Sequence, residues 1–234
     1  MVALVLFAAG CSGGGSGDRI AFASDRDGDY EIFVMNADGT DVRQLTSNED
    51  DEMFPAWSPD GNRIAFMSNR GGEFNIFVMN ADGGAVRQLT DNDDFESTPA
   101  WSPDGTLIAF DSSSLSRDDD TEIFVMNADG TDVRQLTDND DGDHSPAWSP
   151  DGNRIAFQSS RDGDHDIFVM DDDGTHLQQL TDNDDCDGHS TWSPDRNRIA
   201  FTSDRYGDVE IFVMDSDGTN VFGTNQTGFS LDWR

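Results

Sequence analysis

Carboxylates alternate with other residues in several short segments, at a spacing that could present oxygen ligands to a cation. The clearest segment carries Asp25, Asp27, Asp29 and Glu31 around Gly28. Two later segments repeat the pattern, and they supply Asp162, Asp164, Asp166, Asp204, Asp208 and Glu210. Carboxylate oxygens are the ligands that Ca²⁺ takes in proteins. These residues are therefore the candidate metal ligands, and Ca²⁺ is the candidate cofactor.

The same residues also favour a second interpretation without any ion. Asp and Gly are common in hairpin turns, because Asp bonds to nearby backbone and Gly tolerates positive φ. In the segment that starts at Asp25 the glycine is fourth, whereas the EF-hand calcium loop places it sixth. Both interpretations stay open at this stage. Arginines lie among these carboxylates, and we expect them to pair internally and fix the loops: Arg26, Arg70, Arg161 and Arg205.

The residues that could catalyse a reaction do not form a recognisable set. The four histidines, His144, His165, His176 and His189, do not share one position in the repeat described below. His144 and His189 lie in successive linkers and could approach each other. No nucleophile–base motif accompanies them. We therefore expect a protein that is not an enzyme.

A repeat of about 44 residues must position these segments. Ile-Ala-Phe begins at Ile20, Ile64, Ile108, Ile155 and Ile199, with steps of 44, 44, 47 and 44 residues. Each copy then has an Ile-Phe-Val-Met run, an Asp-Gly turn and a short polar strand. A tryptophan closes each unit, and we expect these five to pack between blades as structural residues: Trp57, Trp101, Trp148, Trp192 and Trp233. Short apolar runs separated by turns predict strands.

Four strands per repeat at this period are typical of a β-propeller blade. The sequence therefore predicts an all-β fold, a five-bladed β-propeller of four-stranded antiparallel blades. The first copy lacks a tryptophan strand and the chain ends with one, so the C-terminal strand is expected to complete the first blade and close the ring. An open fragment of a six-bladed ring is the alternative. In the fifth copy Arg196 replaces the glycine of the Ser-Pro-Asp-Gly turn, so that turn should be strained or of another type.

Loops alternate between the two ends of such a propeller. The Ser-Pro-Asp-Gly and Asn-Ala-Asp-Gly turns share one end. The candidate metal segments and the linkers between blades share the other. The linkers are themselves acidic, as in Asp91–Asp94, Asp138–Asp141 and Asp182–Asp185. This second end should be strongly negative.

The chain has 234 residues and a formal net charge of −34, with no lysine. One domain over residues 18–234 accounts for its length. The charge argues against nucleic-acid binding and against adhesion to anionic lipid. Turn chemistry and solubility in a high-salt habitat, as well as cation sites, would each account for the aspartates.

Residues 1–17 form a separate segment, with an apolar run before Cys11 and a Gly/Ser stretch after it. Ala8-Ala9-Gly10-Cys11 resembles a bacterial lipobox, which would make Cys11 the lipidation site and the Gly/Ser stretch a tether. A plain N-terminal tail is the alternative. If Cys11 carries lipid, Cys186 is left alone, and surrounding aspartates should raise its pKa.

Three motifs of the second copy carry a family resemblance: Pro55–Gly61, Arg63–Phe66 and Ile76–Met79. They resemble the repeat of the TolB-like β-propeller family over residues 18–234. The resemblance implies a non-catalytic binding or scaffold protein of the cell envelope, periplasmic or on the extracellular surface. It would be a monomer that binds a protein or peptide, and it would touch the membrane only through a lipid anchor. The alternatives are a propeller hydrolase or lyase with a site at the channel mouth, and a structural halophilic propeller without a ligand.

Overall fold

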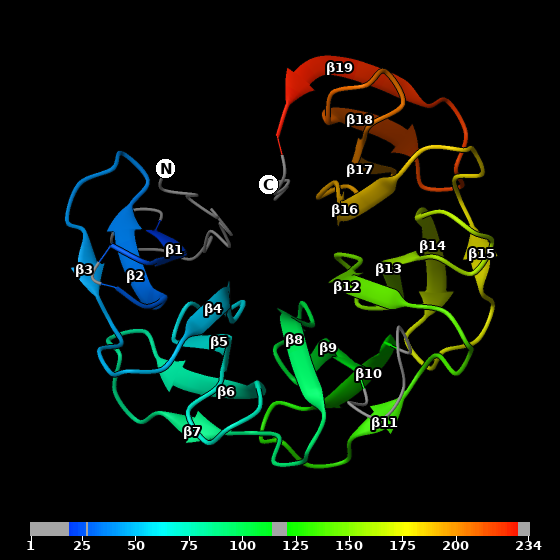
Figure 1. Ribbon diagram of the computed structural model, residues 1–234. Coiled ribbons are helices and arrows are strands. Elements are labelled where there is room, and N and C mark those ends of the chain that lie inside the picture. Colours follow the sequence, from blue (N-terminus) through cyan, green and yellow to red (C-terminus); the bar gives the residue numbers. More distant parts are fainter. Residues whose placement is uncertain (1–18, 27, 114–120, 229–234) are drawn as a thin grey trace.

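The computed structural model describes residues 19–26, 28–113 and 121–228. Every regular element in these residues is a β-strand, and the strands form five antiparallel sheets. The sheets are arranged as blades around a central axis (Figure 1). The predicted all-β, five-bladed propeller is therefore confirmed. The described residues contain no helix long and apolar enough to cross a membrane.

The blades follow one another along the chain. Blade 1 contains β1 (Arg19–Ser24), β2 (Glu31–Asn36) and β3 (Arg43–Gln44). Blade 2 contains β4 (Glu52–Trp57), β5 (Arg63–Ser68), β6 (Asn75–Asn80) and β7 (Arg87–Gln88). Blade 3 contains β8 (Phe95–Trp101), β9 (Leu107–Ser113), β10 (Thr121–Asn127) and β11 (Arg134–Gln135). Blade 4 contains β12 (Asp143–Trp148), β13 (Arg154–Ser159), β14 (Asp166–Asp171) and β15 (Gln178–Gln179). Blade 5 contains β16 (Asp187–Trp192), β17 (Arg198–Ser203), β18 (Glu210–Asp215) and β19 (Phe222–Thr227).

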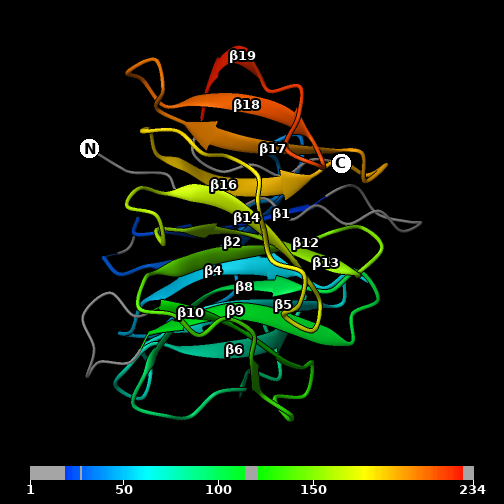
Figure 2. The same cartoon turned by 90° about the vertical axis from the view of Figure 1, so that its right-hand side faces the viewer.

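Each blade runs from the axis outward in sequence order. The tryptophan strands β4, β8, β12 and β16 lie innermost, and the last strand of each blade lies at the rim (Figure 1). Figure 2 shows the blades from the side, stacked around the axis. In the described residues blade 1 has three strands. The strand predicted to complete it, with Trp233, falls in residues 229–234 and lies outside the described residues, as does the predicted segment 1–17 with Cys11.

The hydrophobic core lies between neighbouring blades. Small and branched side chains of one blade, such as Ala21 and Ile32, pack against Trp57 and Phe66 of the next blade. The same arrangement recurs around the ring, with Ile76 and Val78 of blade 2 against Trp101 of blade 3. Alternation along each strand explains this, because successive side chains point to opposite faces of a sheet. The core therefore fixes the angle at which one blade meets the next.

The tryptophans also connect the blades through hydrogen bonds. The indole Nε1 of Trp101 donates to the carbonyl of Ala56 in the preceding blade at 3.2 Å, and Trp148 and Trp192 bond to Ala100 and Ala147 at the same distance. The Nε1 of Trp57 is buried and has no acceptor among the described residues.

The Ser-Pro-Asp-Gly turn keeps one geometry in all four copies. Gly61 has a φ of +67° and donates its N–H to the Ser58 carbonyl at 2.9 Å. Arg196 has a φ of +67° as well, and it makes the matching bond to Ser193 at 2.9 Å. The turn therefore keeps its type, and the arginine adopts the left-handed conformation that costs a non-glycine residue energy. Of the two expected outcomes, the strained turn is the one observed.

Candidate functional site on the acidic face

One end of the propeller collects the hairpin loops 25–26, 28–30, 69–74, 160–165 and 204–209 together with the linkers 45–51, 89–94, 136–142 and 180–186, and we call it the acidic face. Its loops interlock between blades. The Tyr30 N–H donates to the Asp51 carboxylate at 2.9 Å, and the Asp51 N–H donates to Asn69 Oδ1 at 2.8 Å. The opposite end holds the turns, which interlock through bonds such as Ala81 N–H to the Asn62 carbonyl at 2.8 Å. The predicted division into two unlike ends matches this arrangement.

The linkers of the acidic face present aspartates to solvent. Each of three linkers has two exposed aspartates two residues apart: Asp91, Asp93, Asp138, Asp140, Asp182 and Asp184. The asparagine between the two aspartates shapes the turn. Asn139 Oδ1, for example, accepts the Asp141 N–H at 3.1 Å. The carboxylates of these linkers are therefore exposed to solvent, while hydrogen bonds to the asparagine fix the linker backbone.

A second set of carboxylates on this face is buried. It consists of the first acidic residue of each inner strand, fully buried in every case: Glu52, Glu96, Asp143 and Asp187. In three blades an arginine of the adjacent hairpin binds this carboxylate. Arg70 reaches Glu52 at 2.9 Å, Arg161 reaches Asp143 at 2.8 Å, and Arg205 reaches Asp187 at 2.9 Å. These arginines are the ones expected to pair internally.

Each arginine of this set also covers the aromatic core of its own blade. The Arg205 guanidinium lies 4.4 Å from the centroid of Phe212, and Arg161 lies 4.7 Å from that of Phe168. A guanidinium that contacts both an aromatic ring and a buried carboxylate is stabilised by both interactions. These arginines are therefore structural, and their charges are neutralised within the protein.

Glu96 differs from the other three, because no arginine reaches it in the part of the chain that the structure describes. Its oxygens accept hydrogen bonds from Thr90 Oγ1 at 3.1 Å and Ser112 Oγ at 3.4 Å. Burial raises the pKa of Glu96 to about 7. Since the charged form is the one that burial penalises, Glu96 is a neutral acid over much of the acidic pH range.

Two candidate metal ligands also have raised pKa values. Burial, with Glu52 beside it, raises the pKa of Glu31 to about 7. Burial raises the pKa of Asp166 to about 7 too, although Thr181 Oγ1 donates to it at 2.7 Å. Each is the first residue of its strand, β2 or β14, and its side chain is buried. These two residues are therefore part of the buried carboxylates of this face as well as of its hairpin loops.

The structure brings one candidate metal set together. Ligand oxygens of Asp162, Asp164 and Asp166 lie within 4.8 Å of one another, a spacing that could hold a metal ion. Among the described residues, no such cluster forms around Asp25, Asp29 and Glu31, or around Asp204, Asp208 and Glu210. Asp27 lies outside the described residues. Glu31 instead accepts the Asn48 N–H at 2.7 Å, and Asp204 accepts the Cys186 N–H at 2.9 Å.

The wall of the channel contains a recurrent strained residue that the sequence did not indicate. Each inner strand has a bulge at which a non-glycine residue takes positive φ, namely Phe54, Thr98, Ser145 and His189, with φ of 51°, 44°, 55° and 49°. Asp111 braces two of these bulges, since it accepts Thr98 Oγ1 at 2.6 Å and the Ser145 N–H at 3.0 Å. Backbone strain of this kind often accompanies binding sites.

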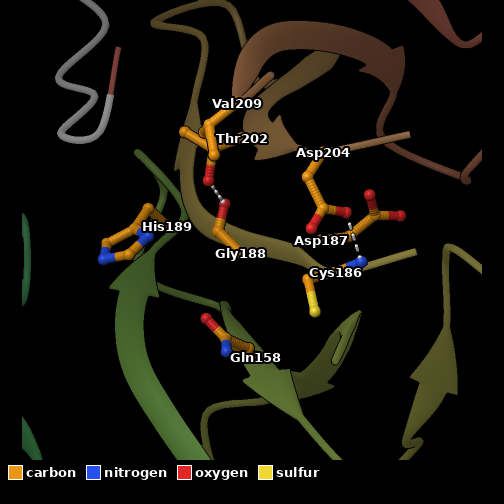
Figure 3. A pocket seen from close by; sticks show the side chains of 8 residues that line it. All are labelled: Gln158, Cys186, Asp187, Gly188, His189, Thr202, Asp204 and Val209. Carbon is orange, nitrogen blue, oxygen red and sulfur yellow. Dashed lines mark hydrogen bonds between the residues drawn. The ribbon is translucent and has the colours of Figure 1, made fainter. Parts of the chain in front are cut away.

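A cavity of about 160 Å³ opens beside the bulge of blade 5. Figure 3 shows the residues that line it, which come from β13 of blade 4, from the linker to blade 5, and from β16, β17 and the β17–β18 hairpin of blade 5: Gln158, Cys186, Asp187, Gly188, His189, Thr202, Asp204 and Val209. Cys186 is an exposed free thiol. Burial, together with Asp204, raises its pKa, in the direction expected from the sequence.

Two histidines of blade 4 lie next to each other. The ring centroids of His144 and His165 lie 6.4 Å apart in an edge-to-face arrangement. His144 thus lies close to His165 of its own blade, a neighbour that the sequence did not suggest. Burial and the neighbouring His144 lower the pKa of His165, and burial lowers the pKa of His189. Both imidazoles are therefore neutral at physiological pH.

Comparison of the sequence with models of known protein families tests the family resemblance that the repeat motifs indicate. The family model described as the TolB β-propeller domain matches residues 12–114, 95–165 and 142–229. The chain belongs to the TolB β-propeller domain family. The predicted TolB-like resemblance is thus confirmed, and comparison with curated proteins gives no match.

Solved structures share the TolB-type propeller. A putative TolB from Agrobacterium tumefaciens has a TM-score of 0.75 and 24% identity, over 88% of this chain and 76% of that protein. TolB from Acinetobacter baumannii has a TM-score of 0.77 and 25% identity, over 91% of this chain and 54% of that protein. An oligogalacturonate lyase in complex with manganese has a TM-score of 0.69 and 15% identity, over 88% and 61%. The TolB-type propeller therefore occurs both in TolB and in an enzyme.

Proposed function

We propose that this protein is a non-catalytic binding module of TolB type, and that its acidic face holds a protein or peptide partner. The observation that carries this proposal is how charge is distributed on that face. The linkers present pairs of exposed aspartates, while Arg70, Arg161 and Arg205 are bound to buried carboxylates. The face is therefore left with uncompensated negative charge. Such a surface favours a partner with complementary positive charge and speeds its association.

The arrangement of polar groups supports binding rather than catalysis. The hydroxyls of Ser97 and Thr98 lie against the Asp111 carboxylate, but that carboxylate also accepts the Ser145 N–H. The Asp111 carboxylate therefore stabilises the bulges. None of these three hydrogen bonds involves a histidine that could act as a general base. A hydrolase or lyase with a site at the channel mouth is the competing function, because the manganese-bound lyase shares the fold. Activity screening with and without a chelator separates the two.

Neutralising the linkers tests the binding proposal directly. We expect the sixfold Asp→Asn variant of the linker aspartates named above to lose partner capture by about tenfold or more at 0.15 M salt, because long-range attraction falls with the charge. A matched variant neutralises six exposed aspartates of the opposite end: Asp41, Asp82, Asp132, Asp172, Asp173 and Asp217. Capture from envelope extract, quantified for both variants, makes the comparison. Equal loss in both, or no capture above an unrelated acidic protein, contradicts the proposal and favours a structural propeller without a ligand.

We propose Ca²⁺ as the ion for Asp162, Asp164 and Asp166. Three carboxylates within reach of one another suit a hard cation, and binding would displace the proton that Asp166 otherwise holds. At pH 8 we expect Ca²⁺ at about 100 times its Kd to add about 2.7 kcal/mol to the free energy of unfolding. That corresponds to a rise of about 5 °C or more in Tm for a chain of this size.

The measurement is a thermal melt with micromolar to millimolar Ca²⁺ against molar KCl. Asp164→Asn should abolish the response, and Asp182→Asn, which changes an exposed linker aspartate by the same charge, should keep it. A Tm that follows bulk salt alone, in the wild type and both variants, contradicts the calcium site.

We also propose a location in the cell envelope, periplasmic or at the extracellular surface, with Cys11 as the lipid tether. The TolB-type propeller and the lipobox-like residues before Cys11 support it. Labelling with a radioactive fatty acid, lost in a Cys11→Ser variant, tests the tether.

A further inference from the structure

The cavity lies between blades 4 and 5, at a position where blade 5 departs from the repeat. Gly188 follows the buried acidic residue of its inner strand, where the other described inner strands have Met53, Ser97 and His144. A Cβ at Gly188 would lie 2.3 Å from the Gln158 side-chain oxygen. The missing side chain therefore leaves room for the Gln158 side chain, which forms one wall of the cavity. The other described inner strands fill the equivalent place with a side chain.

The charge of the lining comes from one group. Asp187 is bound through both oxygens by Arg205, at 3.0 and 2.9 Å, so its charge is compensated. Asp204 uses Oδ1 for the Cys186 N–H at 2.9 Å, and no arginine pairs with it in the part of the chain that is described. Figure 3 shows Asp204 on the side of the cavity next to Cys186, with Gln158 and His189 across from it. The cavity thus combines one uncompensated carboxylate with neutral groups.

The neutral groups decide what kind of cation fits. Val209 and the Gly188 backbone give an apolar part, and the Gln158 amide offers an acceptor. The Thr202 hydroxyl is taken, since it donates to the Gly188 carbonyl at 3.0 Å. The volume of about 160 Å³ is close to the roughly 150 Å³ of protein cavities that hold benzene. A small cation with an aliphatic stem has about as many non-hydrogen atoms as benzene, so it is of a size that this cavity could hold.

We infer that this cavity receives the side chain of an arginine from a basic peptide partner. The inference rests on the proposed function and names the chemistry of its partner. An arginine matches the lining, because its aliphatic stem can lie against Val209 while its planar donors meet Asp204 and the Gln158 amide oxygen. His189 is expected to repel it little, since desolvation lowers the pKa of that imidazole and favours its neutral form.

The test uses the whole protein and two short peptides, Gly-Arg-Gly and Gly-citrulline-Gly. Citrulline keeps the shape of arginine and removes its charge. Binding is followed by NMR shifts of the backbone amides of residues 186–189. We expect saturable shifts with the arginine peptide and affinity lower by about tenfold or more for the citrulline peptide, as for loss of a charge-assisted hydrogen bond.

Asp204→Asn is the decisive variant, and it should lower the affinity for the arginine peptide by about tenfold as well. The fold should tolerate it, because Asn69 holds the equivalent place in blade 2 and its Oδ1 accepts the Asp51 N–H at 2.8 Å. Asp172→Asn removes the same charge from an exposed aspartate at the opposite end of the propeller, and it should change the affinity less than twofold. Gly188→Ala, whose Cβ would displace the Gln158 side chain, should weaken binding while Tm is checked in parallel.

Equal binding of the two peptides, equal losses in Asp204→Asn and Asp172→Asn, or shifts that do not saturate would each overturn the inference. A lysine peptide that binds as tightly as the arginine peptide would overturn the choice of arginine. The proposed function fails separately. If partner capture depends on the linker aspartates while the arginine peptide does not bind, the cavity inference alone is wrong. If the peptide binds and the linker variant captures its partner normally, the wider face is not the binding surface.

Discussion

Glu96→Gln is expected to raise the free energy of unfolding by about 3 kcal/mol at pH 8. Burial raises the pKa of this carboxyl from 4.5 to about 7, so at pH 8 the folded protein holds a buried charge that the unfolded chain exposes to water. The cost follows from linkage, at about 1.4 kcal/mol for each pH unit between the two values. Glutamine keeps the shape and the bonds to Thr90 and Ser112 without the charge.

The sign of the pH dependence provides a further check. An acid whose pKa is raised by folding stabilises the native state below its unfolded pKa, and this stabilisation is lost as the pH rises through the folded value. Wild-type stability should therefore fall from pH 4.5 to 7, and Glu31 and Asp166 add to the fall. Urea denaturation across this range, in high salt to screen the surface charge, measures it.

The Glu96→Gln variant should match the wild type at pH 4.5 and show a shallower fall above it. Glu73→Gln changes an exposed glutamate of the preceding blade and should leave the pH profile as it is. A Glu96→Gln profile parallel to that of the wild type would show that Glu96 is not the titrating group.

Arg161→Met is expected to destabilise the protein by about 3–5 kcal/mol at neutral pH. Asp143 is fully buried and is held by the Arg161 Nη2 at 3.0 and 2.8 Å, so the variant leaves a buried charge without its cation. Methionine retains the aliphatic bulk over Phe168, which keeps the loss of packing small. The measurement is the denaturation midpoint at constant m-value.

The double variant Arg161→Met/Asp143→Asn separates charge from packing. It should recover more than half of the loss, because the buried charge is gone. Arg43→Met removes the exposed pair of Arg43 with Asp41, whose atoms are 3.8 Å apart, and should cost about 0.5 kcal/mol or less. A loss of that small size in Arg161→Met would show that the buried pair does not stabilise the blade.

The repeat was enough to predict the blades, because each strand carries its own apolar run and each turn its own Asp-Gly signal. It also predicted which loops share the acidic face, since alternation of loops follows from antiparallel strands. The strain at Arg196 was predictable for the same reason, as a glycine position occupied by another residue. In each case a local sequence pattern determines the local geometry, and because the pattern repeats about every 44 residues, the same geometry recurs in every blade.

Other features depend on contacts between blades, which the repeat does not encode visibly. Glu52, Glu96, Asp143 and Asp187 look like further members of acidic linkers, and nothing in their spacing shows that they are fully buried. The positive φ of Phe54, Thr98, Ser145 and His189 could not be predicted, because none of these positions is a glycine. The three candidate metal segments look equivalent in sequence, yet only the fourth copy gathers three ligands among the described residues, because its hairpin and strand happen to converge. The cavity likewise depends on residues of two blades, since Gln158 of blade 4 lies against Gly188 of blade 5.

The hydrogen bonds from the tryptophan indoles all run in the same direction around the ring. Each described bond runs from the tryptophan of one blade to the carbonyl of the blade before it, so every blade is a donor on one side and an acceptor on the other. Such units join head to tail, as subunits do in heterologous assemblies. In a closed ring the last contact is made within the same molecule. Among the described residues the Trp57 donor is buried without such an acceptor, so the bond that blade 1 should make falls at the junction between the last blade and the first.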